Sequence, residues 1–310
     1  MNETTTGANT GAHPPLGRLL SVTISVTDLP SVVDAYRTHL GYRLLESGYI
    51  PAALAQSWAA PQNAEARYGL MAPPSDPSVC IRFVEGLTPE NYRPLRTFGW
   101  AAVEIAVMDV DALAARLAGT QFETIGPPAD LAFGGGALRA MSVRGPAREI
   151  LIFTQIRRAV PGYDLPAAID PVDRAFIAVA AADDLHKVRL FYRDKFLAPS
   201  GPDIETPIYS VNDAFDLPRE DRHLMTTIAL PGQSYVEIDQ YPEMGAKRVG
   251  VRGYLAPGIA MVTFEIGGLD DLPLYWLGEP SHYEIAPYMG RRQVTFYGAT
   301  GELIELIETG

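Results

Sequence analysis

Histidine and carboxylate side chains with the chemistry of an acid–base or metal site lie in the last third of the chain. His223 stands at the start of an alternating strand, 224–230, and Glu305 lies in an otherwise apolar strand. A buried carboxylate is costly unless a cation pairs with it, so Glu305 is either paired with Arg or Lys or functional. With His282, which precedes the last strands, these residues are ligand types that iron or manganese accepts. The alternative for His223 is a surface or turn position.

A unit that repeats along the chain must position these side chains. Each copy begins with an alternating strand, continues with an Asp that can cap a helix, and ends in an apolar strand. The Asp positions are Asp28, Asp109, the pair Asp183 and Asp184 and, in a degenerate fourth copy, the pair Asp270 and Asp271. In that copy Pro273 leaves room for little more than a helical turn. The pattern predicts an α+β fold of four tandem β-α-β-β-β modules; an α+β protein without repeats is the alternative.

The division of the chain into domains follows from one segment without apolar periodicity. Residues 157–172 are rich in Pro, Ala and Asp, which is typical of a linker. We therefore expect an N-terminal paired-module domain over 18–156 and a C-terminal one over 173–310. Residues 1–17 are expected to form a disordered tail.

Composition limits the partners and the compartment. The net charge of −12 disfavours nucleic acid and anionic membranes, which require clustered basic residues. Cys80 stands alone, which excludes an intrachain disulfide and zinc sites built on several cysteines. The N-terminus lacks the pattern of a signal peptide, and no apolar run is long enough to span a bilayer. We expect a cytoplasmic protein that binds a small molecule and can form a homodimer.

Four segments carry a resemblance to a known family: 22–28, 35–42, 191–197 and 301–306. On these residues the chain resembles the vicinal oxygen chelate superfamily, which includes glyoxalase I, extradiol dioxygenases and bleomycin resistance proteins. The resemblance covers nearly all of residues 18–308. It implies that paired modules curl their sheets into two cups, and that metal ligands come from the first and last strands of the modules.

The ligand positions implied by this resemblance are mostly occupied by other residues. The first-strand histidine falls near Ser21, Ala102, Arg174 and Thr263, and the last-strand acid falls at Arg82, Leu151, Glu237 and Glu305. One carboxylate does not hold a transition metal, so a metal-free protein is favoured; a divalent iron or manganese ion is the alternative. Arg174 is the expected cation that replaces the metal beside a carboxylate in the C-terminal cup.

Two further features are similar to extradiol dioxygenases. His223 ends an Asp-Arg-His segment like the one whose histidine acts as an acid–base group in those enzymes, and Tyr297 lies where they carry a supporting tyrosine; otherwise Tyr297 lines the core or the cup. We therefore expect one site in the C-terminal cup. Its catalytic residues are His223, Tyr297 and Glu305, and its substrate-binding residues are Arg174, Glu237, Thr263, Glu265 and His282.

Alternation along two strands also places carboxylates at matching repeat positions. Glu104 lies between Ala102 and Ala106, and Glu265 follows Thr263, so each Glu faces either a cup or solvent. The expected function is an enzyme acting on a small aromatic or oxygenated molecule, with dioxygenase-like or metal-independent lyase or isomerase chemistry. The alternative is a non-catalytic, drug-sequestering protein of the bleomycin-resistance type.

Overall fold

The computed structural model describes residues 14–132, 134–270 and 272–310, which form four successive modules. Module 1 comprises β1 (Leu16–Val26), α1 (Leu29–Ala35), a π-helical turn (Tyr36–Leu40), β2 (Arg43–Tyr49), α2 (Ala52–Ser57), a 3₁₀ turn (Pro61–Asn63), β3 (Arg67–Ala72) and β4 (Cys80–Glu85). Module 2 comprises β5 (Gly99–Val107), α3 (Val110–Leu117), β6 (Glu123–Asp130), β7 (Leu138–Arg144) and β8 (Ile150–Ile156). Module 3 comprises β9 (Val172–Ala182), α4 (Leu185–Phe196), β10 (Ile204–Pro207), α5 (Tyr209–Ala214), β11 (Arg222–Leu230) and β12 (Ser234–Gln240). Module 4 comprises β13 (Gly258–Ile266), β14 (Ser281–His282), β15 (Arg292–Tyr297) and β16 (Leu303–Glu308).

The module helices begin at the predicted aspartates. Asp28, Asp109 and Asp184 each accept a hydrogen bond from a backbone N–H three residues later, which satisfies a donor that the first helical turn leaves free. Gly41 ends the first helical segment in the left-handed conformation. In module 4 no helix forms among the described residues between β13 and β14.

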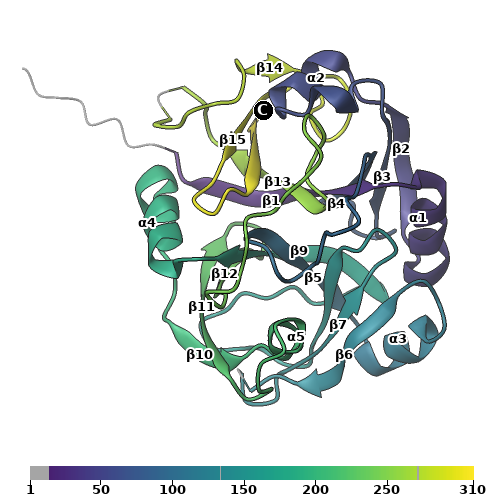
Figure 1. Cartoon of the computed structure of the whole chain (residues 1–310), viewed down its shortest axis with the longest axis vertical. Helices are drawn as coiled ribbons and strands as arrows, with labels where there is room; N and C mark the ends of the chain where they lie inside the picture. The colour runs from purple at the N-terminus through teal and green to yellow at the C-terminus, as the bar shows by residue number, and fades with distance from the viewer. Residues whose placement is uncertain (1–13, 133, 271) are drawn as a thin grey trace, which may run out of the picture.

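Two eight-stranded mixed sheets contain all the strands (Figure 1). The first has the order β14-β15-β16-β13-β1-β4-β3-β2, and the second β10-β11-β12-β9-β5-β8-β7-β6. The two-cup α+β fold is therefore confirmed. We call the concave face of the first sheet the first cup and that of the second sheet the second cup.

The modules pair differently from the expectation. β1 pairs antiparallel with β13, and β5 pairs antiparallel with β9, so module 1 joins module 4 while module 2 joins module 3. Pairing within each half of the chain was the wrong expectation, because the sheets do not divide at residues 157–172. That segment connects β8 with β9, which lie in one sheet. Similar modules present similar strand edges, so periodicity defines the modules but not their partners.

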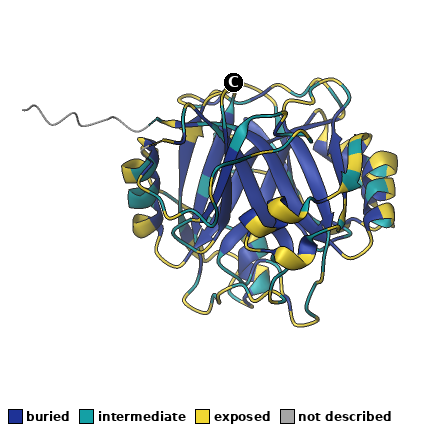
Figure 2. Ribbon diagram, turned by 90° about the horizontal axis from the view of Figure 1, so that it is seen from above, coloured by how far each residue is buried: buried dark blue, intermediate teal, exposed yellow. Residues whose placement is uncertain are grey.

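The main hydrophobic core lies between the two sheets. It combines Val22 and Phe264 of the first sheet with Val103 and Ala180 of the second, together with the inner faces of α1, α3 and α4. The convex faces of the sheets thus pack against each other, and the strands are buried while the flanking helices keep exposed outer surfaces (Figure 2). The cups open on the opposite sides. No helix in the described ranges is long and apolar enough to cross a membrane.

Candidate functional site

An ion pair occupies the centre of the first cup. Arg82 on β4 donates from Nη2 to Glu305 Oε2 on β16 at 3.0 Å, and from Nε to Thr23 Oγ1 on β1 at 3.0 Å. Thr263 on β13 donates to Glu305 Oε2 at 2.8 Å. The register brings the four strands to this point, because Thr23 pairs with Arg82 and Thr263 pairs with Glu305.

Two aromatic side chains seal this ion pair from solvent. Trp58, directly after α2, donates from Nε1 to Glu305 Oε1 at 2.9 Å, and its ring lies 4.8 Å from the Arg82 guanidinium carbon. The Tyr288 hydroxyl lies 2.6 Å from Arg82 Nη1 and 2.8 Å from Glu305 Oε1. All four side chains are essentially inaccessible. Both charges are fully hydrogen-bonded, so this centre is a closed part of the core.

The first cup does not fit a metal ion. Arg82 stands at a position where the resembled superfamily carries a metal-ligating acid, and a guanidinium is always a cation that donates and never coordinates. Thr23 and Thr263 fill the neighbouring first-strand positions, and Glu305 is committed to Arg82. A guanidinium therefore balances the carboxylate at the point where a metal would otherwise do so.

Three carboxyl groups line the second cup. Glu104 lies on β5, and Glu237 and Asp239 lie two residues apart on β12, so alternation points all three into the cup. Glu104 and Asp239 are buried and Glu237 is partly exposed. Thr154 on β8 donates to Glu104 Oε2 at 2.7 Å. Asp239 Oδ1 has no hydrogen-bond donor among the N–H and hydroxyl groups of the described residues.

Burial raises the pKa of each of these carboxyl groups, and repulsion by neighbouring carboxylates raises the pKa of Glu237 and Asp239 further. Burial is the main cause for Glu104, and the pKa of Glu237 rises further because Asp239 and Glu104 lie close to it. The pKa of Asp239 is raised mainly by burial and then by the negative charge of Glu104. No Lys, Arg or His of the described residues opposes these shifts in pKa. Glu237 and Asp239 lie two residues apart on the same face of β12, so each carboxyl group is the other's neighbour.

The second cup fits a metal no better than the first. Its four positions equivalent to Thr23, Arg82, Thr263 and Glu305 are Glu104, Ile152, Val179 and Glu237, as the strand register places them. Two aliphatic residues thus stand at ligand positions. Within the described ranges, no three His, Cys, Asp or Glu side chains lie close enough to share an ion.

The segment after β8 folds over the second cup. Tyr163 and Tyr235 have ring centroids 5.8 Å apart, and the backbone N–H of Asp164 donates to the Tyr235 hydroxyl at 2.8 Å. Thr227 Oγ1 lies 3.3 Å from the Tyr163 hydroxyl. The segment expected to be a linker, 157–172, is therefore a cover that packs on β11 and β12.

The structure divides the predicted site residues between the two sheets. His223 and Glu237 lie in the second sheet, whereas Thr263, Glu265, His282, Tyr297 and Glu305 lie in the first. The expectation that His223 and Glu305 share one cavity is thus wrong. The physical reason is the module pairing: β16 lies beside β13 in the first sheet, and β11 lies beside β12 in the second.

Each of the remaining predicted residues has a distinct environment. His223 shares the second-cup face of β11 with Thr227 and lies 2.5 Å from Asn212 Oδ1 of α5 through Nε2. Burial lowers the pKa of His223, and Asp221 partly opposes this. Arg174 pairs with Asp76 at 2.9 Å, not with a cup carboxylate.

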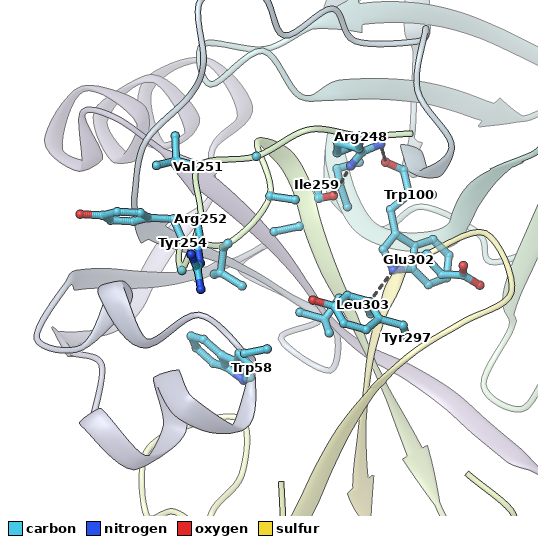
Figure 3. Close-up of a pocket in the computed structure, with 18 of the residues that line it drawn as sticks. Trp58, Trp100, Arg248, Val251, Arg252, Tyr254, Ile259, Tyr297, Glu302 and Leu303 are labelled. Atoms are coloured by element: carbon cyan, nitrogen blue, oxygen red, sulfur yellow. Dashed lines mark hydrogen bonds between the residues drawn. The ribbon is translucent and has the colours of Figure 1, made fainter. Parts of the chain in front are cut away.

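The other first-sheet candidates lie at the rim. Glu265 pairs with Arg18 at 3.3 Å and with Arg291 at 3.4 Å. His282 is exposed and its Nδ1 lies 2.9 Å from the Gly290 carbonyl. Tyr297 is half exposed and lines a pocket of about 260 Å³ at the edge of the cup (Figure 3), which we call the rim pocket.

Sequence reasoning missed several site residues for a traceable reason. The first-strand positions fall five residues before the helix-capping Asp, at Thr23, Glu104 and Val179, rather than at Ser21, Ala102 and Arg174. Counting back from the cap would have found them. Leu151 faces the main core, and its neighbour Ile152 faces the second cup. Asp239 follows Glu237 by two, so strand alternation also indicated it. No local pattern predicted Trp58 or Tyr288.

Comparison with known proteins places this geometry in a family. Residues 18–149 match the model of the Glyoxalase/Bleomycin resistance protein/Dioxygenase superfamily. In this part the chain is similar to that superfamily. Over both halves the fold is similar to that of glyoxalase I from Zea mays, with a TM-score of 0.63 and 15% identity, covering 94% of this chain and 92% of that one. A Bacillus subtilis protein provisionally described as a dioxygenase has a TM-score of 0.57 and 12% identity, covering 96% and 86%. A search of curated proteins finds no match.

Proposed function

We propose that the protein is an enzyme of this superfamily that moves protons on a small oxygenated molecule in the second cup, without using a metal. Glu237, Asp239 and Glu104 are the proposed acid–base groups. The observation that carries the proposal is the cluster itself: three carboxyl groups share one concave surface, and no Lys, Arg or His of the described residues opposes the rise in their pKa values.

The protonation state of the cluster suits acid–base work. A general acid or base is most effective when its pKa lies near the working pH, and burial together with repulsion moves these carboxyl groups in that direction. Glu237 and Asp239 lie two residues apart on one face of β12, so one can give up a proton while the other accepts one. Glu237 keeps partial exposure, so it is the member that a substrate reaches.

The cup supplies the orientation that proton transfer needs. Thr154 holds Glu104 through one oxygen, and the strands fix the spacing of Glu237 and Asp239. A substrate that bears a hydroxyl next to a carbonyl can donate a hydrogen bond from the hydroxyl to one carboxylate. A second carboxylate can then remove a proton from the carbon that bears the hydroxyl. The cover formed by Tyr163 and its neighbours limits water at this point. These features favour isomerase or lyase chemistry over oxidation.

The test is carbon–deuterium exchange on small α-hydroxy ketones, hydroxyacetone and 2-hydroxyacetophenone, followed by proton NMR in D₂O. The wild type should accelerate loss of the proton signal of the carbon that bears the hydroxyl. Glu237→Gln and Asp239→Asn should each lower the rate by about 100-fold or more, which is typical of a lost general base. Glu220→Gln is the control and should leave the rate unchanged, because Glu220 is exposed and its side chain forms no hydrogen bond or ion pair among the described residues.

A second measurement separates the cluster from the choice of substrate. Carbon-13 NMR of the side-chain carboxyl groups should show at least one second-cup signal that titrates far above the ordinary range, and Glu104→Gln should lower that midpoint by removing a neighbouring charge. If all three groups titrate as ordinary carboxylates, or if Glu237→Gln exchanges as fast as the control, the proposal is wrong.

A further inference from the structure

The rim pocket is distinct from the carboxyl cluster of the second cup. Its walls come from residues 250–256 before β13, from the start of β5, and from the turn between β15 and β16 (Figure 3). Trp58 separates it from the Arg82–Glu305 ion pair. The pocket is therefore open to solvent on one side and bounded by a rigid, hydrogen-bonded core on the other.

One cation at this pocket has no partner. Arg252 is exposed, and it forms no hydrogen bond or ion pair that involves another residue of the described ranges. The second arginine of the wall, Arg248, is different: it donates to Thr97 Oγ1 at 3.1 Å and to the Ile259 carbonyl at 2.7 Å, and so braces the wall. The net charge of the chain is −12, so this unpaired guanidinium gives the pocket a charge opposite in sign to that of the molecule as a whole.

The nearest carboxylate of the wall does not neutralise Arg252. Glu302 is buried, and its Oε2 accepts hydrogen bonds from the backbone and the hydroxyl of Thr300 at 2.7 and 2.6 Å. Figure 3 shows its carboxyl group on the far side from Arg252. The positive charge of the pocket thus remains available to a ligand.

Aromatic residues form part of the remaining wall. Phe98 and Tyr297 line it, and Tyr297 is 52% exposed, whereas Trp100 is buried behind it. Its hydroxyl points toward the middle of the pocket, across from Arg252, and has no hydrogen-bond partner in the described part of the chain (Figure 3). Flat aromatic walls favour a flat ligand, and a free hydroxyl opposite a guanidinium favours a ligand that is polar at both ends.

We propose that the rim pocket binds a single-ring aromatic carboxylate, with Arg252 as the ion-pair partner and Tyr297 at the opposite end. A guanidinium matches a carboxylate with two parallel N–H donors. The volume of about 260 Å³ lies just below the usual range of roughly 300–1,000 Å³ for small-molecule pockets, so it admits one ring and not a nucleotide.

The experiment is calorimetric titration of the full chain with 4-hydroxybenzoate. Benzyl alcohol and benzylamine serve as neutral and cationic probes of similar size, and inorganic phosphate serves as an anion without a ring. The wild type should bind 4-hydroxybenzoate and neither of the two uncharged or cationic probes. Arg252→Gln should weaken binding by at least about tenfold, and Tyr297→Phe by a smaller factor. Arg43→Gln is the matched control, because Arg43 is also exposed and its side chain forms no hydrogen bond or ion pair within the described part of the chain.

The outcomes separate this pocket from the proposed catalytic cup. Binding should persist in Glu237→Gln, since that residue lies in the other sheet. Absence of binding to the wild type at 10 mM probe, or equal affinities for Arg252→Gln and Arg43→Gln, would overturn the assignment. Displacement of 4-hydroxybenzoate by equimolar phosphate would overturn its aromatic part, because the ring would then contribute nothing.

Discussion

Arg82 and Glu305 meet 3.0 Å apart in the middle of one sheet, although 223 positions separate them in the sequence. Neither side chain is reached by solvent. Each is the main charge partner of the other, because β4 and β16 lie on either side of the central pair formed by β1 and β13. The charge balance of this sheet therefore depends on both ends of the chain.

Removing one member of this pair should be severe. Arg82→Met leaves the Glu305 carboxylate buried without a cation, and we expect the free energy of unfolding to fall by about 3–5 kcal/mol. Adding Glu305→Leu should restore part of that loss, since an apolar pair of similar size avoids the buried charge. Urea unfolding measures both. The control is Arg67→Met, which breaks an exposed pair with Glu85 and should cost at most about 1 kcal/mol. Equal losses for Arg82→Met and Arg67→Met would contradict this account.

The stability of the fold should decrease as the pH rises from about 4.5 to about 7, in part because of Glu149. Burial raises the pKa of Glu149 to about 7, although the hydrogen bond that it accepts from the Tyr36 hydroxyl favours the charged form and lowers the pKa. A group whose pKa is raised by folding holds its proton more tightly in the folded state. Its contribution to the free energy of unfolding is therefore complete below the pKa of the unfolded state and is lost as the pH rises through the pKa of the folded state. Glu149→Gln should flatten this part of the profile in urea titrations at pH 5 and pH 8, whereas exposed Glu90→Gln should not.

His223 should titrate in the opposite sense. Its pKa is lowered by burial, and Asp221 partly counters this, so its NMR midpoint should lie below about 6.5. Asp221→Asn should move it lower still. Because folding depresses this pKa, the stability that the neutral ring contributes is present above about 6.5 and is lost as the pH falls through the folded value. A midpoint above 6.5 would contradict this expectation, because it would require a stronger interaction with a negative charge than Asp221 provides.

The cover of the second cup should loosen when one hydroxyl is removed. Tyr235→Phe deletes the acceptor of the Asp164 backbone N–H, which leaves that donor without its partner. Arg157 and Arg158 are exposed in the same segment, so limited trypsin digestion should cut there faster in the variant than in the wild type. Tyr275→Phe, at a position that is 98% exposed, should leave the cleavage rate unchanged.

The sequence allowed the fold to be predicted in detail because its signals are local. The capping aspartates and alternating strands mark each module, and the structure has helices beginning at all three predicted caps. The partner of each module is not local information. It depends on which edge strands meet after the chain has folded back.

The candidate site could be predicted only in pieces for the same reason. Glu237 and Glu305 were identified as last-strand acids, and their strands do carry them into cups. The expectation that Arg174 pairs with a cup carboxylate was wrong: Arg82 contacts Glu305, and Arg174 contacts Asp76. Arg82 reaches Glu305 only through the pairing of modules 1 and 4, which no pattern in either module records.

Modules 2 and 3, which form the second sheet, lie in the sequence between modules 1 and 4, which form the first sheet. In chain order the second sheet is therefore the inner one and the first sheet the outer one. During synthesis the inner sheet is complete once Gln240 has left the ribosome, whereas β1 must keep an unpaired edge until β13 has emerged. Such an edge is a template for wrong pairing between nascent chains. Its closest substitute is β5, which precedes β9 and could capture β1 first. A chain in which β1 pairs with β5 before β9 arrives would not form the first sheet.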